Sequence, residues 1–389
     1  MTTDSSIKNE SSAYEKTIQE FPLGAAAQEL EGLPGGRGIN IAHEAVVKQA
    51  HNKNANNIAL RFVCENGSLQ DFSFERLHEL SSRFANIMQQ LCINQGETIA
   101  YLGGRGPEMH VALLGSLKAK LIFAPISVHF GIGMIATLLR LADPSIVISS
   151  SVDFEKLIKP IWYKQPKLRY ILLTDASIHE NERLLSLTLL MRQSRDGFEI
   201  PVTAPDTPAL LHFTSGTTGI PKAVLHSHSA AKSFFIAGQY VLDFKKDDII
   251  LSTTDPGWIA DTVYGIVAPL MHGITTVVKE WTLNDYNCID FLRDLKITIW
   301  LTKSAGLKTL RYENISHHEP LSLPDLRFIE IVGESPDADT MSWAKSALGK
   351  SVMENLLQTE AGGIVIANSP MIPHKPGSLG RPLPGIELA

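Results

Sequence analysis

Two hydrophobic periods alternate along the chain from about residue 39 onward. Apolar residues recur at the spacing of an amphipathic helix over residues 74–91, and further helices are predicted at 108–118 and 133–141. Short apolar runs separate these segments, and their length and composition are typical of strands. The predicted strands are GETIAYL, KLIFAPI, SIVIS, RYILL, DIILST, GITTVV, ITIWLT and LRFIEIV.

This alternation of strands and helices predicts an α/β fold with a mostly parallel sheet that is covered by helices on both faces. Residues 1–38 are polar and then rich in Gly and Pro, so we expect a poorly ordered N-terminal extension followed by one domain over residues 39–389. Residues 177–208 carry a cluster of prolines and are a candidate linker. We prefer to interpret them as a surface connection within one domain.

Composition and charge narrow the class of protein. The 389 residues include 35 Lys and Arg against 41 Asp and Glu, a formal net charge of −6, and no basic run that would favour nucleic acid or an anionic membrane. The three cysteines lie far apart, so neither a disulfide framework nor a zinc site is indicated. No secretory signal and no apolar run of roughly 20 residues is present. We expect a soluble, cytoplasmic protein without nucleic-acid or membrane partners.

The strongest chemical signal lies in residues 210–228, LLHFTSGTTGIPKAVLHSH. The pattern predicts a strand, a loop, a second strand and a helix from about Ser229. Gly216 and Gly219 allow positive φ angles and close approach of a ligand to the backbone. Lys222 adds a positive charge for a phosphate group. The hydroxyl donors of the loop are Thr214, Ser215, Thr217 and Thr218.

We interpret this loop as a cradle for a phosphate chain. The alternative is a flexible, hydroxyl-rich turn. The spacing differs from that of the Walker A loop, because Ile220 and Pro221 separate the second glycine from Lys222. No GxGxxG motif follows a strand, and no GxSxG or HExxH motif supports a hydrolase. For His212, His226 and His228, which flank the loop, we expect structural or capping roles.

TSGTTGIPKAVLH resembles the signature loop of the adenylate-forming superfamily, which includes acyl-CoA synthetases, luciferases and the adenylation domains of peptide synthetases. DPGWIADTVYGIVAPLMHG, residues 255–273, resembles the AMP-forming acetyl-CoA synthetases and their medium-chain relatives. IVGES, LLQTEAGG and KPGSLGRPLPGIE extend the similarity. The resemblance implies the large N-terminal domain of an enzyme that converts a short- or medium-chain carboxylic acid and ATP to acyl-AMP and pyrophosphate. Coenzyme A then takes the acyl group as a thioester.

The resemblance also implies roles for individual residues. Thr214, Lys222 and Glu360 would be catalytic, with Glu360 holding Mg²⁺, a hard cation that prefers oxygen ligands. The ATP or AMP contacts would come from Thr214, Ser215, Gly216, Thr217, Thr218, Gly219, Lys222, Gly333, Glu334, Ser335, Glu354, Asn355, Leu356 and Thr359. The acyl group would lie against Trp258, Ile259, Ala260, Val332 and Leu357.

The chain departs from the family pattern at two places near these residues. Acetate enzymes carry Asp-Thr-Trp-Trp where this chain has Glu354, Asn355, Leu356 and Leu357. The second tryptophan limits the pocket to acetate, so Leu357 predicts an acid larger than acetate. Relatives carry Ala-Pro-Thr-Ala beside the nucleotide, where this chain has Lys303, Ser304, Ala305 and Gly306.

The family's large domain is followed by a small lid domain whose lysine catalyses adenylation, and we expect this chain to lack that lid. The chain alone would then bind ATP weakly and turn over poorly. One alternative is a non-catalytic or degenerate relative that binds a nucleotide or an acyl group. Another is an adenylation domain that delivers its acid to a carrier protein, although the DPGW segment favours a CoA-forming enzyme. The oligomeric state stays open.

Overall fold

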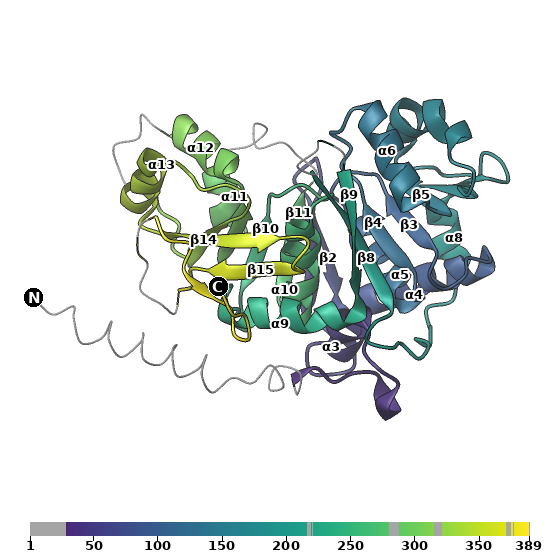
Figure 1. Ribbon diagram of the computed structural model, residues 1–389, viewed down its shortest axis with the longest axis horizontal. Coiled ribbons are helices and arrows are strands. Elements are labelled where there is room, and N and C mark those ends of the chain that lie inside the picture. The colour runs from purple at the N-terminus through teal and green to yellow at the C-terminus, as the bar shows by residue number, and fades with distance from the viewer. Residues whose placement is uncertain are drawn as a thin grey trace, which may run out of the picture.

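The computed structural model describes residues 29–215, 219, 221–279, 288–314, 321–370, 375 and 377–388. These residues form two sheets, in which most neighbouring strands are parallel (Figure 1). The fold is therefore α/β with largely parallel sheets flanked by helices, as the alternating hydrophobic pattern predicts.

The larger sheet has nine strands and places the carboxyl ends of its central parallel strands at one edge. Strands β2, β15 and β16 are antiparallel to their neighbours and lie at the two sides of the sheet. The order across the sheet is β16 (Arg381–Pro382), β15 (Gly363–Ala367), β14 (Ser351–Gln358), β13 (Phe328–Ile331), β12 (Ile299–Thr302), β10 (Ile249–Ser252), β11 (Thr275–Lys279), β1 (Ile58–Val63) and β2 (Leu69–Ser73).

The smaller sheet has seven strands, and only its last strand, β9, is antiparallel to its neighbour. Residues 177–208 contain β7 and a helix that belong to this sheet and its cover, so they form a connection within the fold. The order is β7 (Leu184–Ser186), β6 (Tyr170–Leu173), β5 (Ile146–Ser149), β3 (Thr98–Tyr101), β4 (Ile122–Pro125), β8 (Pro208–Ser215) and β9 (Pro221–Ser227).

Helices fill the connections between the strands. The α-helices are α3 (Lys48–Ala50), α4 (Phe74–Gln90), α5 (Pro107–Lys118), α6 (Ile132–Ala142), α7 (Ser151–Asp153), α8 (Leu187–Gln193), α9 (Ala231–Tyr240), α10 (Ala268–Met271), α11 (Cys288–Asp294), α12 (Ser304–Glu313) and α13 (Ala338–Trp343). Short 3₁₀ or π-helical turns are η1 (Pro34–Gly36), η2 (His43–Val47), η3 (Phe154–Ile158), η4 (Lys159–Lys164), η5 (His228–Ala230), η6 (Ala260–Val267) and η8 (Ala344–Leu348).

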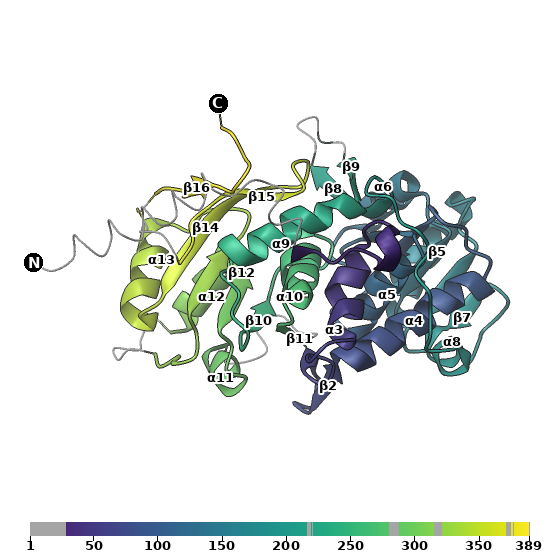
Figure 2. The ribbon, with the colours of Figure 1, turned by 90° about the horizontal axis from the view of Figure 1, so that it is seen from below.

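One hydrophobic core joins the two sheets. It contains Ile146 and Phe123 from the seven-stranded sheet, Ile250 and Phe328 from the nine-stranded sheet, and buried residues of α4, α5, α9, α10 and η6. Figure 2 shows α9 and α10 lying between the sheets. Separate clusters cover the outer faces, with α11, α12 and α13 on one sheet and α6 and η3 on the other. The layers therefore run helix, sheet, helix, sheet, helix, and the two sheets are held in one packed body.

The predicted elements agree closely with the observed ones. The helical pattern over 74–91 forms α4, which begins after Ser73, whose side chain accepts a hydrogen bond from the Arg76 amide. The other predicted helices form α5 and α6, and the eight apolar runs form β3, β4, β5, β6, β10, β11, β12 and β13. Most of these strand residues are buried, as expected for strands covered on both faces.

Residues 30–33 pack against the domain, although they precede residue 39, where the sequence pattern predicts that the domain begins. Leu30 and Leu33 are buried, and the Glu44 carboxylate accepts hydrogen bonds from the backbone amides of Glu31 and Gly32. The Gly- and Pro-rich composition of this segment predicts a poorly ordered extension. The two leucines and the hydrogen bonds to Glu44 instead hold it against the domain. Residues 1–28 lie outside the part that the structure describes.

No helix among the described residues combines the length and the apolar character needed to span a membrane.

We predict that Gly115 is required for the close packing of α5 against α4. A Cβ atom at Gly115 would lie 2.7 Å from Phe84 Cδ1 and 2.7 Å from the Ser81 carbonyl oxygen. Gly115→Ala should therefore lower the free energy of unfolding by about 1–3 kcal/mol, measured by chemical denaturation. The control is Gly133→Ala in α6, where a Cβ has no neighbour within 4 Å, and it should raise stability by about 0.5–1 kcal/mol. Equal effects at the two positions would contradict this account.

Candidate functional site

The predicted phosphate loop joins two antiparallel strands. Strands β8 and β9 pair so that Thr214 lies opposite Lys222 and Ser215 lies opposite Pro221. Gly219 has a φ of +78° and is exposed, as predicted for a glycine in this loop. Gly216, Thr217 and Thr218 lie outside the described residues. The hairpin thus places a hydroxyl and an ammonium group at the base of the loop.

A second hairpin carries Glu360. Strands β14 and β15 are antiparallel, and Thr359 to Gly362 form the turn between them. Tyr264, buried in η6, supports this turn because its hydroxyl accepts a hydrogen bond from the Ile364 amide at 2.8 Å. A Cβ at Gly363 would lie 2.2 Å from that hydroxyl, so only glycine permits the contact. Sequence reasoning missed Tyr264, although it stands in the DPGW segment.

The two hairpins meet at a hydrogen bond between catalytic candidates. Thr214 Oγ1 donates to Glu360 Oε1 at 2.9 Å, across 146 positions of sequence. The pKa of Glu360 is lowered by its own backbone amide, by the Thr214 hydroxyl and by the charge of Lys222. Glu360 is exposed, so its ionised carboxylate is available to a ligand. The structure therefore brings Thr214, Lys222 and Glu360 together.

Four of the residues predicted to contact the acyl group follow the carboxyl ends of strands in the nine-stranded sheet, with Trp258, Ile259 and Ala260 after β10 and Val332 after β13. Trp258 follows β10 and is 44% exposed, whereas Ile259, Ala260 and Val332 are buried in the main core. Gly333 follows β13, and a Cβ there would lie 3.8 Å from Trp258 Cζ3. Glu334 and Ser335 follow on the surface, where both are exposed. Trp258 is therefore the most exposed of the residues predicted to contact the acyl group.

Lys303 directly follows β12, and its side chain contacts Trp258. Its Nζ lies 3.8 Å from the centroid of the Trp258 ring, within the range of a cation–π contact. Burial lowers the pKa of Lys303, and the Asp255 carboxylate opposes that shift. Asp255 is engaged by Ser127 Oγ and by the Gly257 amide. Lys303 departs from the family pattern, and the sequence alone predicts no function for it.

Four predicted site residues lie on β14, in the hairpin that carries Glu360. Glu354 and Asn355 are buried, and Leu356 and Leu357 are half-buried. The Asn355 amide nitrogen donates to Glu330 Oε1 at 2.5 Å and to the Ile331 carbonyl at 3.1 Å. Asn355 thus binds the neighbouring strand β13. Burial raises the pKa of Glu330 to about 8.

The histidines that flank the phosphate loop have structural contacts. His228 Nδ1 accepts a hydrogen bond from the Ile41 amide at 3.0 Å, and His212 Nε2 lies 3.2 Å from Thr262 Oγ1. His226 packs 5.8 Å from His212, ring centroid to centroid. Within the described ranges, no three His, Cys, Asp or Glu residues form a group that could hold a metal ion.

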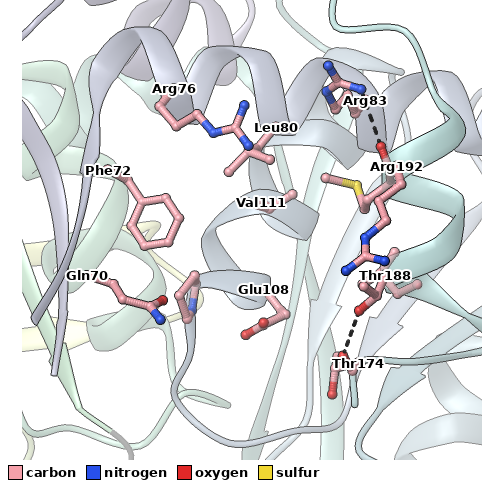
Figure 3. A pocket seen from close by; sticks show the side chains of 13 residues that line it. Gln70, Phe72, Arg76, Leu80, Arg83, Glu108, Val111, Thr174, Thr188 and Arg192 are labelled. Carbon is pink, nitrogen blue, oxygen red and sulfur yellow. Dashed lines mark hydrogen bonds between the residues drawn. The ribbon is translucent and has the colours of Figure 1, made fainter. Parts of the chain in front are cut away.

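A cavity of about 400 Å³ lies elsewhere, between β2, α4, α5 and α8. Figure 3 shows Phe72, Leu80 and Val111 along its wall, with Arg76 and Arg192 among the charged residues around it. None of the predicted site residues lines this cavity. Arg192 is exposed, which makes it a suitable control position for experiments on the phosphate loop.

We predict that ionisation of Glu330 destabilises the folded protein. Its pKa of about 8 exceeds the ordinary value of 4.5, so between these pH values the folded state retains a proton that the unfolded chain releases. The free energy of unfolding should therefore contain a contribution that falls as pH rises through this window. Glu330→Gln removes this contribution, so its stability relative to wild type should rise from pH 5 to pH 8. Calorimetry checks this, with the exposed Glu65→Gln as control.

A stability difference between Glu330→Gln and wild type that is the same at every pH would contradict this prediction.

Comparisons with known proteins identify the family of the chain. A family model described as "AMP-binding enzyme" matches residues 47–389. An acetyl-coenzyme A synthetase of Bacillus subtilis is 27% identical over 99% of this chain and 66% of its own length. Another from Chlorobaculum tepidum is 29% identical over 89% of this chain and 56% of its own length. The chain thus spans 56–66% of these curated relatives.

A solved structure supports the same fold. A crystal structure of Brucella canis acyl-CoA synthetase superimposes with a TM-score of 0.85 at 23% identity, over 96% of this chain and 67% of that one. This likeness concerns the fold alone. The family match covers most of the chain, including both hairpins and the carboxyl edge that bears Trp258. The chain therefore belongs to the family of AMP-binding enzymes.

Proposed function

We propose that this chain carries the acid-activating site of an acyl-CoA synthetase. The carboxylate oxygen of a short- or medium-chain acid attacks the α-phosphorus of ATP, the bond to the β-phosphate breaks, and pyrophosphate leaves. The thiol of coenzyme A then attacks the acyl carbon of the acyl-AMP, loses its proton and displaces AMP. The observation that carries this proposal is the contact of Thr214 with Glu360 beside Lys222.

Each of these three side chains has a chemical task in the first step. A carboxylate and a triphosphate repel each other, so their approach requires fixed donors and positive charge. Lys222 is exposed and supplies positive charge at the base of the phosphate loop. Thr214 contributes a hydroxyl, and its bond to Glu360 fixes the position of the carboxylate. The loop residues Ser215 to Gly219 are proposed to surround the β and γ phosphates.

Glu360 and Thr214 fit a magnesium ion that is bound chiefly through phosphate oxygens. Mg²⁺ commonly uses one or two protein carboxylates and completes its shell with phosphate oxygens and water. Glu360 offers one exposed carboxylate whose lowered pKa favours the charged form. When bound, the ion neutralises phosphate charge during the attack.

The remaining proposed contacts follow from position. Gly333, Glu334, Ser335, Glu354, Asn355, Leu356 and Thr359 lie on or after β13 and β14 and are proposed to line the nucleotide. Trp258, Ile259, Ala260, Val332 and Leu357 are proposed to surround the acyl group. The curated relatives named acetyl-coenzyme A synthetase support this class of acid.

We predict that Mg-ATP raises the melting temperature of this chain and that the hairpin contact is required for the effect. Thr214→Ala, Lys222→Met and Glu360→Gln should each weaken Mg-ATP binding by about tenfold, because each removes a charge-assisted contact. Glu360→Gln should in addition reduce the dependence on Mg²⁺. Titration calorimetry and thermal shifts check these values, with Arg192→Ala as control. Unchanged binding in all three variants would overturn the site assignment.

Pyrophosphate release with a panel of acids from acetate to octanoate tests the chemical step. Release that requires both the acid and Mg-ATP supports the synthetase. Binding of Mg-ATP with no release would instead favour a relative that binds the nucleotide without activating an acid.

We predict that Leu357 helps to set the length of the acid. A tryptophan at this half-buried position would occupy space beside the proposed acyl group. Leu357→Trp should lower pyrophosphate release with butyrate relative to acetate by roughly 15-fold. Butyrate has two more methylenes than acetate, and their burial in the pocket is worth about 1.6 kcal/mol. Pyrophosphate release across the acid panel measures the ratio. Leu356→Trp is the neighbouring control. A wild-type preference for acetate that falls steeply at butyrate would contradict the prediction.

A further inference from the structure

Lys303 stands where the topology of the nine-stranded sheet favours a ligand. Strands β10 and β12 are adjacent, and the chain leaves them toward opposite sides, to β11 and to β13. Ligands of open α/β sheets bind outside the carboxyl ends of strands at such a switch point. Trp258 follows β10 and Lys303 follows β12, so both side chains come from this point.

The Lys303 ammonium group lies on an aromatic face and lacks a direct anionic partner among the described residues. Its Nζ lies over the Trp258 ring at 3.8 Å, and no described carboxylate lies within the 4.0 Å of an ion pair. Asp255 and Asp261 exert attraction from farther away. Both are held by other groups, Asp255 by Ser127 and Asp261 by the hydroxyls of Ser252 and Thr254. The half-buried amine therefore retains donors for an oxyanion.

The helix that follows gives no structural reason for a lysine. Lys303 is the N-cap residue of α12, and its side chain makes no capping hydrogen bond. Ser, Thr, Asp and Asn are preferred at this position, and a cation is unfavourable beside the positive end of a helix. An anion bound at Lys303 would interact favourably with both the ammonium group and the first amides of α12.

The next residue adds a second unsatisfied donor. Ser304 is fully buried, and its hydroxyl has no hydrogen-bond partner in the described structure. Buried hydroxyls are normally paired, so this one leaves an unsatisfied polar group at the start of α12 among the described residues. The Lys303 ammonium group and the first amides of α12 are suited to a carboxylate. Trp258 is 44% exposed and offers further apolar surface beside the ammonium group for a short carbon chain.

The geometry points to a dicarboxylic acid as the substrate, with its second carboxylate bound by Lys303. This inference rests on the proposed function, in which the first carboxylate reacts with ATP. Lys222 and Glu360 stand on the two hairpins, whereas Trp258 and Lys303 stand after the carboxyl ends of β10 and β12. The site thus has two separate charged ends, one for the nucleotide and one for the far end of the acid.

Titration of this chain in Mg-ATP with matched pairs of acids tests the inference. The pairs are malonate with propionate, succinate with butyrate, and glutarate with valerate. Lys303→Met should weaken the best dicarboxylate by about tenfold or more, the value of a charge-assisted hydrogen bond, and its matched monocarboxylate by less than about twofold. Lys303→Arg should retain most of the dicarboxylate affinity.

The control is Lys308→Met. Lys308 lies on the same helix and pairs with Asp337 at 3.3 Å, away from Trp258, so its loss should leave both classes of acid unchanged. Lys303→Ser supplies a preferred cap and should keep the fold at least as stable as wild type, which separates lost binding from lost folding.

Three results of the titrations with acids would overturn the inference. They are equal binding of each matched pair by wild type, an equal loss of both classes in Lys303→Met, and no binding of any acid by a chain that binds Mg-ATP. Titrations with ATP alone and coenzyme A alone test whether the anion at Lys303 is instead a phosphate, and a Lys303-dependent loss confined to these ligands also overturns it. Failure of the proposed function appears separately, as Mg-ATP binding that is insensitive to Thr214, Lys222 and Glu360.

Discussion

The bond between Thr214 and Glu360 joins the two sheets of the molecule at the proposed reaction centre. Thr214 is the penultimate residue of β8 in the seven-stranded sheet, and Glu360 lies in the turn after β14 of the nine-stranded sheet. A single surface hydrogen bond is worth only about 1 kcal/mol, so it cannot hold two sheets in register. The common core between them, with α9 and α10 in its middle layer, supplies that rigidity. The hydrogen bond forms because the core aligns the two sheets. A shift of one sheet would separate the Thr214 hydroxyl from the Glu360 carboxylate.

Rigidity is also built in beneath the Glu360 turn. Tyr264 comes from the middle layer, and its hydroxyl bonds to the Ile364 amide where the β15 backbone passes at Gly363. The same core therefore supports the Glu360 turn and the β8–β9 hairpin that carries the phosphate loop. On the adjoining strand, the Asn355 amide is bonded to Glu330. A protonated Glu330 offers a donor as well as an acceptor, which suits a buried pair in which Glu330 Oε2 and Asn355 Oδ1 lack partners among the described residues.

The sequence predicts much of this architecture because its elements have clear periods. Buried parallel strands appear as apolar runs, and α4 has an apolar stripe and a serine cap. The phosphate loop is contiguous, so Thr214 and Lys222 are predictable from local spacing. Contacts between strands that are distant in sequence are harder to predict. Lys303 meets Trp258 only because β12 pairs with β10, although β11 lies between them in the chain. Asn355 meets Glu330 only through the parallel register of β13 and β14.

Lys303 shows why a local mismatch can indicate function. An N-cap serine or aspartate would satisfy an amide of α12, and a lysine there forgoes about 1 kcal/mol and adds repulsion from the helix dipole. The contact with the Trp258 ring offsets part of that loss, because a partly exposed cation–π pair contributes about 0.5–1 kcal/mol. The fold alone therefore gains nothing from lysine at this position. A ligand that brings a second negative charge to the same edge reverses the balance, since it uses the ammonium group and the helix end together.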